Sequence, residues 1–269
     1  MKFPSEKTEP TKPGILGKIA RIYDTLGLVS PVTLEGKLLY RDACEAKVFW
    51  DAQLPIKLTQ DWSRWEQRLP QICTVPQSLA NHREEIQSIQ LHAFGDASGK
   101  VVAAAVFAMV VQESGTNQGL VAAKARLAKQ GLTIPQQELV SGHMVVNLVM
   151  KVCEALEGFP VTETHCWLDS TVALHWIKGP GEYKQFVNNL VNKIQAHCEV
   201  SWHHVGTSEN PADLGSRGGD VAHQTLWWNG PKWLSNREQW PLNSNNSVQR
   251  INGGSQGSAR DLRSGNSLN

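Results

Sequence analysis

Residues 100–111 form an apolar run, KVVAAAVFAMVV, in which a single lysine precedes eleven uncharged side chains. Turn residues bound this run on both sides, with a Ser-Gly pair before it and ESGTNQG after it. A short apolar run between turn signals predicts a buried strand. The neighbouring stretches IQSIQLHAFGDAS and GLVAAKARLA predict strands on either side, so residues 86–128 are expected to form an antiparallel meander joined by two hairpins.

The residues after the meander alternate between helical and strand patterns. TIPQQELVSGHMVVNLVMKVCEALEG predicts a long helix, with Thr133 as its cap, Pro135 in its first turn and Gly158 just past its end. THCWLDS and EVSWHHVG predict two more strands, separated by the helical stretches STVALHWIK and EYKQFVNNLVNKIQAHC. ENPADLGSRGG predicts a last short helix, capped by Asn210 and opened by Pro211. This order predicts an α/β fold with a mixed five-stranded sheet and flanking helices.

Composition divides the chain into five segments. Residues 14–85 have apolar residues at helical spacing, with Ser30 as the expected cap before Pro31 and with Trp62, Trp65 and Leu69 on one helix face. The Ser-, Gly- and Asn-rich end predicts disorder. The expected segments are a flexible N-terminus at 1–13, a helical segment at 14–85, the α/β domain at 86–219, a Trp-rich extension at 220–241 and a disordered tail at 242–269.

Charge and cysteine content exclude several classes of protein. The net charge of +1 gives no sign of a strongly basic surface, and the five cysteines form no CxxC pair that would indicate zinc or a disulfide framework. No apolar run is long enough to span a membrane, and MKFPSEKTEPTKPG lacks the apolar core of a signal peptide. We therefore expect an intracellular, cytoplasmic protein that does not enter a membrane.

Four carboxylates lie where strands end or helices begin. Asp96 ends the first strand, Asp169 ends the fourth, Glu138 lies in the first turn of the long helix and Asp213 in that of the last helix. Ligands of α/β proteins bind at strand ends, and four converging carboxylates would repel one another unless cations lay between them. Oxygen ligands favour Mg²⁺ or Mn²⁺, and two such ions suit phosphodiester cleavage. These four residues are therefore the candidate catalytic and metal-binding residues; no organic cofactor site is predicted.

Each of these residues also has a simpler interpretation. Asp96 and Asp169 could cap turns or helices, and Glu138 and Asp213 could be acids that the helix dipole favours near an N-terminus. Lys124 and Arg126 share one face of a strand and could contact backbone phosphates or line a solvated edge. His203 and His204 could transfer protons, but we expect them to pack within or at the edge of their strand.

Several long motifs resemble the polyprotein of Bel/Pao long-terminal-repeat retrotransposons, in the region also called the Pao retrotransposon peptidase. They include IYDTLGLVSPVTLEGKLL, DAS, AKARLA, IPQQEL, WLDS, LHWIK, NPADLGSRG and LWWNGPKWL. The resemblance implies that 14–85 is the connection segment of a reverse transcriptase and that 86–219 is a ribonuclease H-like domain. It implies hydrolysis of the RNA strand of RNA–DNA hybrids with two Mg²⁺ or Mn²⁺ ions. No DD dipeptide of a polymerase occurs in the chain.

The resemblance also implies partners and leaves two rival functions open. The expected partners are an RNA–DNA hybrid and the rest of a retrotransposon polyprotein, including its reverse transcriptase and integrase, and a virus-like particle or the nucleus are alternative locations. An aspartic peptidase would need two Asp-Ser/Thr-Gly turns, whereas this sequence offers a single, off-pattern Asp96-Ala97-Ser98-Gly99. The second rival is a non-catalytic or decayed module of the polyprotein.

Overall fold

A computed structural model describes residues 1–75 and 78–241, so the expected disordered tail at 242–269 lies outside the described residues. Five strands form one sheet in the order β3-β2-β1-β4-β5. Its strands are β1 (Ser88–Ala97), β2 (Val101–Gln112), β3 (Gly115–Leu127), β4 (Val161–Leu168) and β5 (Ser201–His204). The first three strands are antiparallel neighbours, whereas β4 runs parallel to β1 and β5 parallel to β4. The predicted mixed sheet is confirmed.

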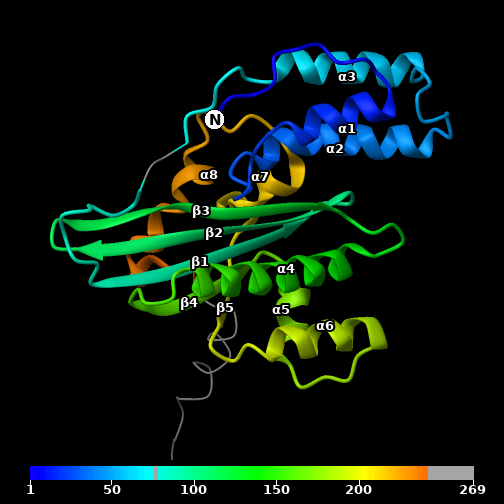
Figure 1. Cartoon of the computed structure of the whole chain (residues 1–269). Helices are drawn as coiled ribbons and strands as arrows, with labels where there is room; N and C mark the ends of the chain where they lie inside the picture. Colours follow the sequence, from blue (N-terminus) through cyan, green and yellow to red (C-terminus); the bar gives the residue numbers. More distant parts are fainter. Residues whose placement is uncertain (76–77, 242–269) are drawn as a thin grey trace, which may run out of the picture.

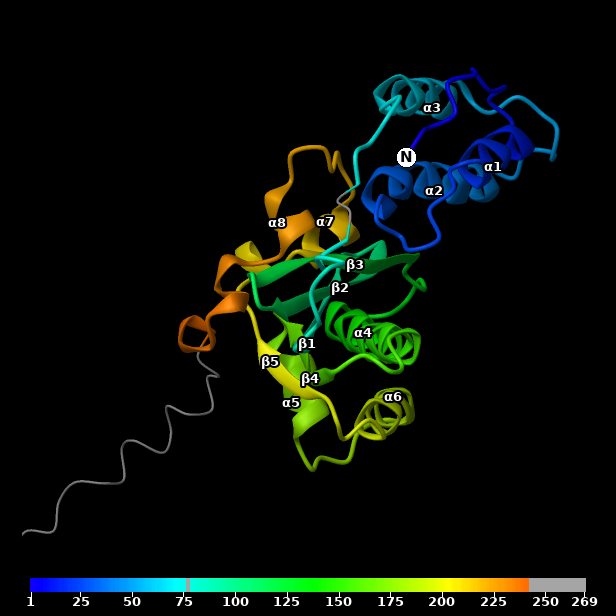
Figure 2. The same cartoon turned by 60° about the vertical axis from the view of Figure 1, so that its left-hand side comes forward.

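Helices cover both faces of this sheet (Figure 1). They are α1 (Lys12–Ala20), α2 (Ser30–Glu45), α3 (Ile56–Arg68), α4 (Ile134–Ala155), α5 (Thr171–Lys178), α6 (Gln185–Gln195), α7 (Ala212–Arg217) and α8 (Thr225–Asn229), with 3₁₀ turns η1 (Thr207–Glu209), η2 (Lys232–Ser235) and η3 (Arg237–Gln239). Helices α4, α5 and α6 lie on one face, and α1, α2, α7 and α8 lie on the other (Figures 1 and 2). Within the described residues, no helix is long and apolar enough to cross a membrane.

Strand β2 is buried on both faces, which explains its continuous apolar sequence. Val106 and its alternate neighbours pack into the core beneath α4, whereas Ala105 and Phe107 pack into the core on the opposite face. Strand β1 alternates in the same way, with Leu91 toward α4 and Phe94 toward the other core. The sheet is therefore the middle layer between two hydrophobic cores.

Local signals predicted some element boundaries correctly and others wrongly. Thr133 begins α4 in a capping box with Gln136, as its sequence predicts. The predicted seven-residue hairpin loop ESGTNQG is wrong: β3 already begins at Gly115 and pairs Thr116 with Val111, which leaves two residues in the turn. The first residues of this strand are polar because its hairpin end is exposed to solvent, so the sequence pattern did not indicate a strand there.

The expected cap of α2 is also wrong. Ser30 is the first residue of α2 and its buried hydroxyl has no hydrogen-bond partner among the described residues. The carboxylate of Asp24 instead accepts hydrogen bonds from the backbone N–H groups of Leu28 and Val29, at 2.8 and 2.9 Å. A carboxylate six residues before the helix organises this turn, which the spacing rules for a cap do not anticipate.

The first residues of the chain pack against the end of the helical segment. Phe3 is buried, and the amino group of Met1 donates a hydrogen bond to the carbonyl of Cys73 at 2.8 Å. Lys2 pairs with Ile72 in a short antiparallel bridge. Residues 1–13, for which the sequence predicts flexibility, therefore include a segment that contributes to the core of the helical region.

The Trp-rich extension fastens the helical segment to the sheet. Trp227 and Trp233 are buried, and Trp227 Nε1 donates a hydrogen bond to the carbonyl of Leu28 at 2.9 Å. Trp233 Nε1 donates to Glu209 Oε1 at 2.8 Å, just before α7. The extension thus contacts both the loop before α2 and the 3₁₀ turn before α7, so it packs the N-terminal helices against the sheet domain.

Three histidines form a row beneath this extension, on β1, β4 and β5. The rings of His92 and His165 are stacked with centroids 5.0 Å apart, and His203 lies 5.2 Å beyond His165. Trp167 Nε1 donates to His92 Nδ1 at 3.3 Å, and Trp240 packs edge-on over His165 with ring centroids 4.8 Å apart. The expectation that His203 packs in its strand is met by this row.

Candidate metal-binding site

Three acidic residues meet at one end of the sheet. Asp96 lies at the end of β1, Asp169 directly follows β4, and Glu138 lies near the start of α4. Strands β1 and β4 are parallel, with Gly95 opposite Leu168, so their carboxyl ends reach the same edge. Helix α4 packs across β1 and β2 and brings its first turns to that edge (Figure 1).

The three carboxyl groups are close enough to share a cation. Asp96, Glu138 and Asp169 each offer one oxygen, and these oxygens all lie within 4.8 Å of one another. Asp96 and Glu138 are buried, with 5 % and 7 % of their surface exposed, and Asp169 is half-buried. Carboxylate oxygens in this arrangement fit Mg²⁺ or Mn²⁺ better than softer metals.

Burial and mutual repulsion disfavour the charged forms of these acids. Burial, followed by the charges of Asp96 and Asp169, raises the pKa of Glu138 to about 8. Burial is also the main cause that raises the pKa of Asp96 to about 6; a hydrogen bond from Ser216 opposes the shift, and Asp169 adds to it. Because such a cluster is costly without a counter-charge, a bound cation would stabilise it.

One oxygen of this cluster has no hydrogen-bond partner in the described part of the chain. Glu138 Oε2 is buried and accepts no hydrogen bond from the described residues. Buried polar atoms are usually paired, so an orphaned carboxylate oxygen beside two other acids is consistent with a ligand position. The residues present therefore fit a divalent cation.

Replacing Glu138 tests this electrostatic cost. Glu138→Gln removes one acid from the cluster and supplies an amide that can donate to Asp96 or Asp169. We expect the metal-free variant to be more stable than the wild type by about 1 kcal/mol, because less repulsion opposes folding. Thermal melting in EDTA at pH 8 measures this difference. Glu113→Gln, on the exposed β2–β3 turn, is the matched control; a Glu138→Gln variant that melts below the wild type contradicts the expectation.

Helix α7 holds Asp96 from the other face of the sheet. The buried hydroxyl of Ser216 donates a hydrogen bond to Asp96 Oδ2, which occupies one of the two carboxylate oxygens. Asn210, also buried, donates from Nδ2 to the carbonyl of Gly95 at 2.9 Å and accepts from the N–H of Ala212 at 3.1 Å. The motif NPADLGSRG therefore both caps α7 and fastens it to β1.

Sequence reasoning missed the roles of Ser216 and of this bond to Gly95. A serine three residues after a helix acid gives no signal of its own, because its partner lies 120 residues away in the chain. Asn210 was predicted only as a cap; its hydrogen bond to the N–H of Ala212 fits that prediction, whereas its bond to the carbonyl of Gly95 was not predicted.

Removing Asn210 should destabilise more than the loss of a helix cap. Asn210→Ala breaks both hydrogen bonds and leaves the carbonyl of Gly95 without its partner, at an expected cost of about 2 kcal/mol. Denaturant unfolding measures this loss, with the exposed Asn192→Ala on α6 as the control. A loss near 1 kcal/mol or less would show that the bond to Gly95 contributes little.

The fourth predicted acid, Asp213, stands apart from the other three. It lies in the first turn of α7, and its carboxylate is not among the oxygens that meet within 4.8 Å. Arg217, four residues later, donates from Nε to Asp213 Oδ1 at 2.5 Å. The exposed Arg217 side chain thus pairs with Asp213 at the rim of the site.

The two adjacent histidines take different positions. His204 is within hydrogen-bond distance of the backbone carbonyl of Asp169, with Nε2 at 3.2 Å, and supports the end of β4. His203 belongs to the buried row described above. Among the described residues, neither imidazole forms a hydrogen bond to a carboxyl group of the three clustered acids.

Lys124 and Arg126 lie on β3, two strands from Asp96. They pair with Ala104 and Val102, both of which pack on the α4 side of the sheet, and both basic side chains are exposed. Two strand spacings place β3 about 10 Å from β1. These residues line a groove beside α4 instead of joining the acidic cluster.

Comparison with known proteins identifies the family of this sequence. A family model described as Pao retrotransposon-like RNaseH-like domain matches residues 11–170, which is more than half of the chain. The match includes Asp96, Glu138 and Asp169 and ends before Asp213. No curated protein sequence matches the chain.

Solved structures with similar folds include ribonucleases H and a viral reverse transcriptase. RNase H1 from the halophilic archaeon Halobacterium salinarum is 17% identical and aligns over 46% of this chain and 90% of its own, with a TM-score of 0.32. The N-terminal RNase H domain of rv2228c from Mycobacterium tuberculosis is 18% identical over 48% of this chain and 90% of that one, with a TM-score of 0.33. The foamy viral protease-reverse transcriptase, solved with an RNA/DNA hybrid, is 12% identical over 75% of this chain and 26% of that one, with a TM-score of 0.40.

The mixed sheet, with its order β3-β2-β1-β4-β5 and helices on both faces, is the ribonuclease H-like fold that the motifs predicted. The long match of the family model covers the N-terminal helices as well as most of this sheet. The chain therefore belongs to the family of Pao retrotransposon-like domains with a ribonuclease H-like fold.

Proposed function

We propose that this domain hydrolyses the RNA strand of RNA–DNA hybrids with two Mg²⁺ or Mn²⁺ ions. The observation that carries this proposal is the meeting of Asp96, Glu138 and Asp169, each from a different element, with oxygens within 4.8 Å of one another. The Oε2 atom of Glu138 adds support, since it offers an acceptor atom that no donor among residues 1–75 and 78–241 uses. When bound, two such ions would supply an activated water and stabilise the leaving oxygen.

The residues of the chain would divide this work between them. Asp96, Glu138 and Asp169 would hold the metal ions, and Asp213 would be a further ligand at the rim of the site. Ser216 would hold one oxygen of Asp96, so that the other faces the metals. His204 would fix the backbone at Asp169 without transferring a proton.

The proposed substrate follows from the fold family. A hybrid would be recognised by its shape and its 2′-hydroxyls, with little sequence preference. Residues 14–85 would form the connection to a reverse transcriptase, 86–219 the nuclease domain, and an integrase would be a further part of the polyprotein. Reverse transcription would take place inside the cell, in the cytoplasm or a virus-like particle. The hypothesis that Lys124 and Arg126 bind phosphates is not part of this proposal, because they line a separate groove.

A cleavage assay tests the function directly. The purified chain should cut the RNA strand of a labelled RNA–DNA hybrid in Mg²⁺, leave single-stranded RNA and double-stranded DNA intact, and lose activity in EDTA. An aspartic peptidase would keep its activity in EDTA and cleave a peptide substrate instead. Absence of hybrid cleavage in both Mg²⁺ and Mn²⁺ would favour the non-catalytic module.

Asp213 is expected to be a peripheral ligand. Since it lies outside the three-acid cluster and pairs with Arg217, Asp213→Asn should lower turnover less than Asp96→Asn does. Added Mn²⁺ should partly restore the activity of Asp213→Asn, because Mn²⁺ binds oxygen and nitrogen ligands more tightly than Mg²⁺. Hybrid cleavage across a metal titration measures both effects. An equal loss in the two variants, without rescue, would place Asp213 among the central ligands.

A further inference from the structure

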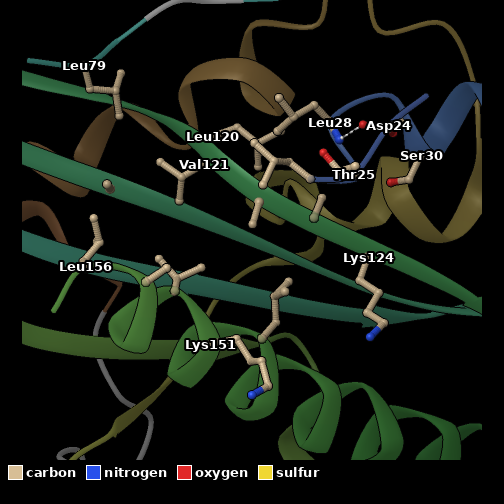
Figure 3. A pocket seen from close by; sticks show the side chains of 18 of the residues that line it. Asp24, Thr25, Leu28, Ser30, Leu79, Leu120, Val121, Lys124, Lys151 and Leu156 are labelled. Atoms are coloured by element: carbon tan, nitrogen blue, oxygen red, sulfur yellow. Dashed lines mark hydrogen bonds between the residues drawn. The ribbon is translucent and has the colours of Figure 1, made fainter.

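A long groove runs along β3 beside the second half of α4 and has a volume of about 1090 Å³ (Figure 3). Its lining is mostly apolar and comes from β2, β3 and α4, together with the loop before α2 and residues 78–86. The apolar side chains that form it include Val110, Leu120, Val121, Leu148, Val152 and Leu156. The groove exists because α4 packs mainly across β1 and β2, which leaves part of the β3 face without a covering helix.

Large apolar side chains remain exposed around this groove. Leu26, from the loop before α2, is 54% exposed, and Phe159, just beyond α4, is 52% exposed. Exposed apolar surface that forms one continuous groove is a mark of an interaction site, whereas single exposed side chains are common.

Charge around the groove is mainly positive. Lys37, Lys124, Arg126 and Lys151 all line it, and Figure 3 shows Lys124 and Lys151 extending from β3 and α4. Asp24 also lines it and interacts with the charge of Lys37, so the positive charge that is left for a partner comes from the other three basic residues. Lys151 also pairs with the exposed Glu154 at 3.0 Å, a contact that solvent weakens.

We propose that this groove docks an amphipathic α-helix of a partner protein, with an apolar stripe toward the sheet and acidic residues along one border. Such a helix would lie beside α4 and complete the layer of helices on this face of the sheet. The stretch of α4 from Leu148 to Leu156 spans about 12 Å, which a partner helix of three to four turns would cover. Its acids would face Lys124, Arg126 and Lys151.

Two other occupants fit the groove less well. A nucleic acid would match the basic rim but would leave the apolar floor without a complementary surface. The chain's own residues 242–269 carry Arg250, Arg260 and Arg263 against a single acid, Asp261, and lack an apolar stripe. Their net charge is positive, like that of the groove, so the two would repel each other.

The groove is separate from the acidic cluster. Glu138 lies ten residues before Leu148 on α4, so about 15 Å of helix separates the cluster from the groove's wall. The proposal therefore stands whether or not the domain cleaves hybrids.

A charge-swap experiment with synthetic helices tests the proposal. Two helical peptides of about 16 residues share one Leu stripe at i, i+3, i+4 and i+7; the acidic peptide carries Glu along one border, and the basic peptide carries Lys there. We expect the acidic peptide to bind the wild-type chain at least ten-fold more tightly than the basic peptide. In Lys124→Glu/Arg126→Glu this preference should reverse, whereas Lys57→Glu, on the exposed face of α3, should leave it unchanged.

Further measurements locate the binding site and define failure. Leu156→Glu places a charge on the apolar wall and should weaken both peptides, and circular dichroism verifies that each variant is folded. The proposal would be overturned if the acidic peptide did not bind or if both peptides bound equally well. It would also be overturned if Leu156→Glu left the affinity of the peptides unchanged. Displacement of the acidic peptide by a 12-base-pair RNA–DNA hybrid would also overturn it, in favour of a phosphate-binding role for Lys124 and Arg126.

Discussion

Asp169→Asn should reduce Mg²⁺-dependent cleavage of an RNA–DNA hybrid by about 10³-fold or more. The substitution preserves size but removes one negative charge from the group formed by Asp96, Glu138 and Asp169. Metal ligands contribute several kcal/mol to stabilisation of the transition state, and each 1.4 kcal/mol corresponds to about ten-fold in rate. Steady-state cleavage of a labelled hybrid measures the effect, under the proposal that this cluster holds the catalytic metals.

Folding should survive this change, which separates a catalytic role from a structural one. Asp169 is half-buried. Its backbone carbonyl lies within hydrogen-bond distance of His204, and a change of the side chain leaves this contact in place. Without metal, the melting temperature of Asp169→Asn should equal or exceed that of the wild type, because repulsion in the cluster is relieved. The exposed Glu113→Gln is the control for charge. Cleavage by Asp169→Asn at the wild-type rate would remove Asp169 from the proposed site.

The meeting of three acids was predictable only in part: the sequence places Asp96 and Asp169 at strand ends, whereas the order of the strands comes from the structure. Asp96 and Asp169 end apolar strands, and parallel neighbours bring such ends to one edge, so their proximity needed only the correct topology. Glu138 followed from the Thr133 and Pro135 signals that set the start of α4. Strong local signals therefore predicted the centre of the candidate site.

Features that depend on distant contacts were not predictable in this way. Ser216 meets Asp96 across 120 residues, and Asp24 organises the turn before α2 through the backbone N–H groups of that turn, a contact that cap signals do not predict. The groove beside α4 exists because this helix covers some strands and not others. The hydrophobic periodicity of a sequence does not indicate which strands a helix covers. The row of His92, His165 and His203 requires the register of three strands, and sequence spacing alone does not give a register.

Acid should destabilise the domain through this row of histidines. Burial, followed by the charges of His165 and His203, lowers the pKa of His92 to about 3. Burial, followed by the charges of His165 and Lys178, lowers the pKa of His203 to about 4. Burial also lowers the pKa of His165, although Glu163, which accepts from His165 Nε2 at 2.8 Å, opposes that shift. The row is therefore uncharged in the folded protein near neutral pH.

The sign of the effect follows from which state binds more protons. A histidine in the unfolded chain has a pKa near 6.5. Below that pH the unfolded chain therefore binds protons that the three histidines of the folded protein do not bind. The stabilising contribution is complete above pH 6.5 and is lost as the pH falls from 6.5 toward the folded values of about 3 and about 4. At pH 5 the loss is about 2 kcal/mol for each such histidine, or up to about 4 kcal/mol for both.

Raised carboxyl pKa values act in the opposite direction. The pKa of Asp96 is about 6 and that of Glu138 about 8, so these groups favour the folded state at low pH and oppose it as the pH rises. A stability profile of the wild type alone therefore mixes two opposing effects. A difference between variants at each pH isolates the histidine contribution, because the carboxyl effect is common to both proteins.

His92→Asn provides that difference. The amide oxygen of asparagine can replace His92 Nδ1 as the acceptor for Trp167 Nε1, and the new side chain does not titrate. At pH 7.5 the variant should be less stable than the wild type, because the smaller side chain loses packing contacts. The difference in the free energy of unfolding between the two proteins should shrink by about 2 kcal/mol at pH 5. Denaturant unfolding at the two pH values measures this difference, with the exposed His223→Asn as the control. A difference that stays constant would mean that His92 is protonated as readily in the fold as outside it, and that the core beneath Trp240 admits charge and water.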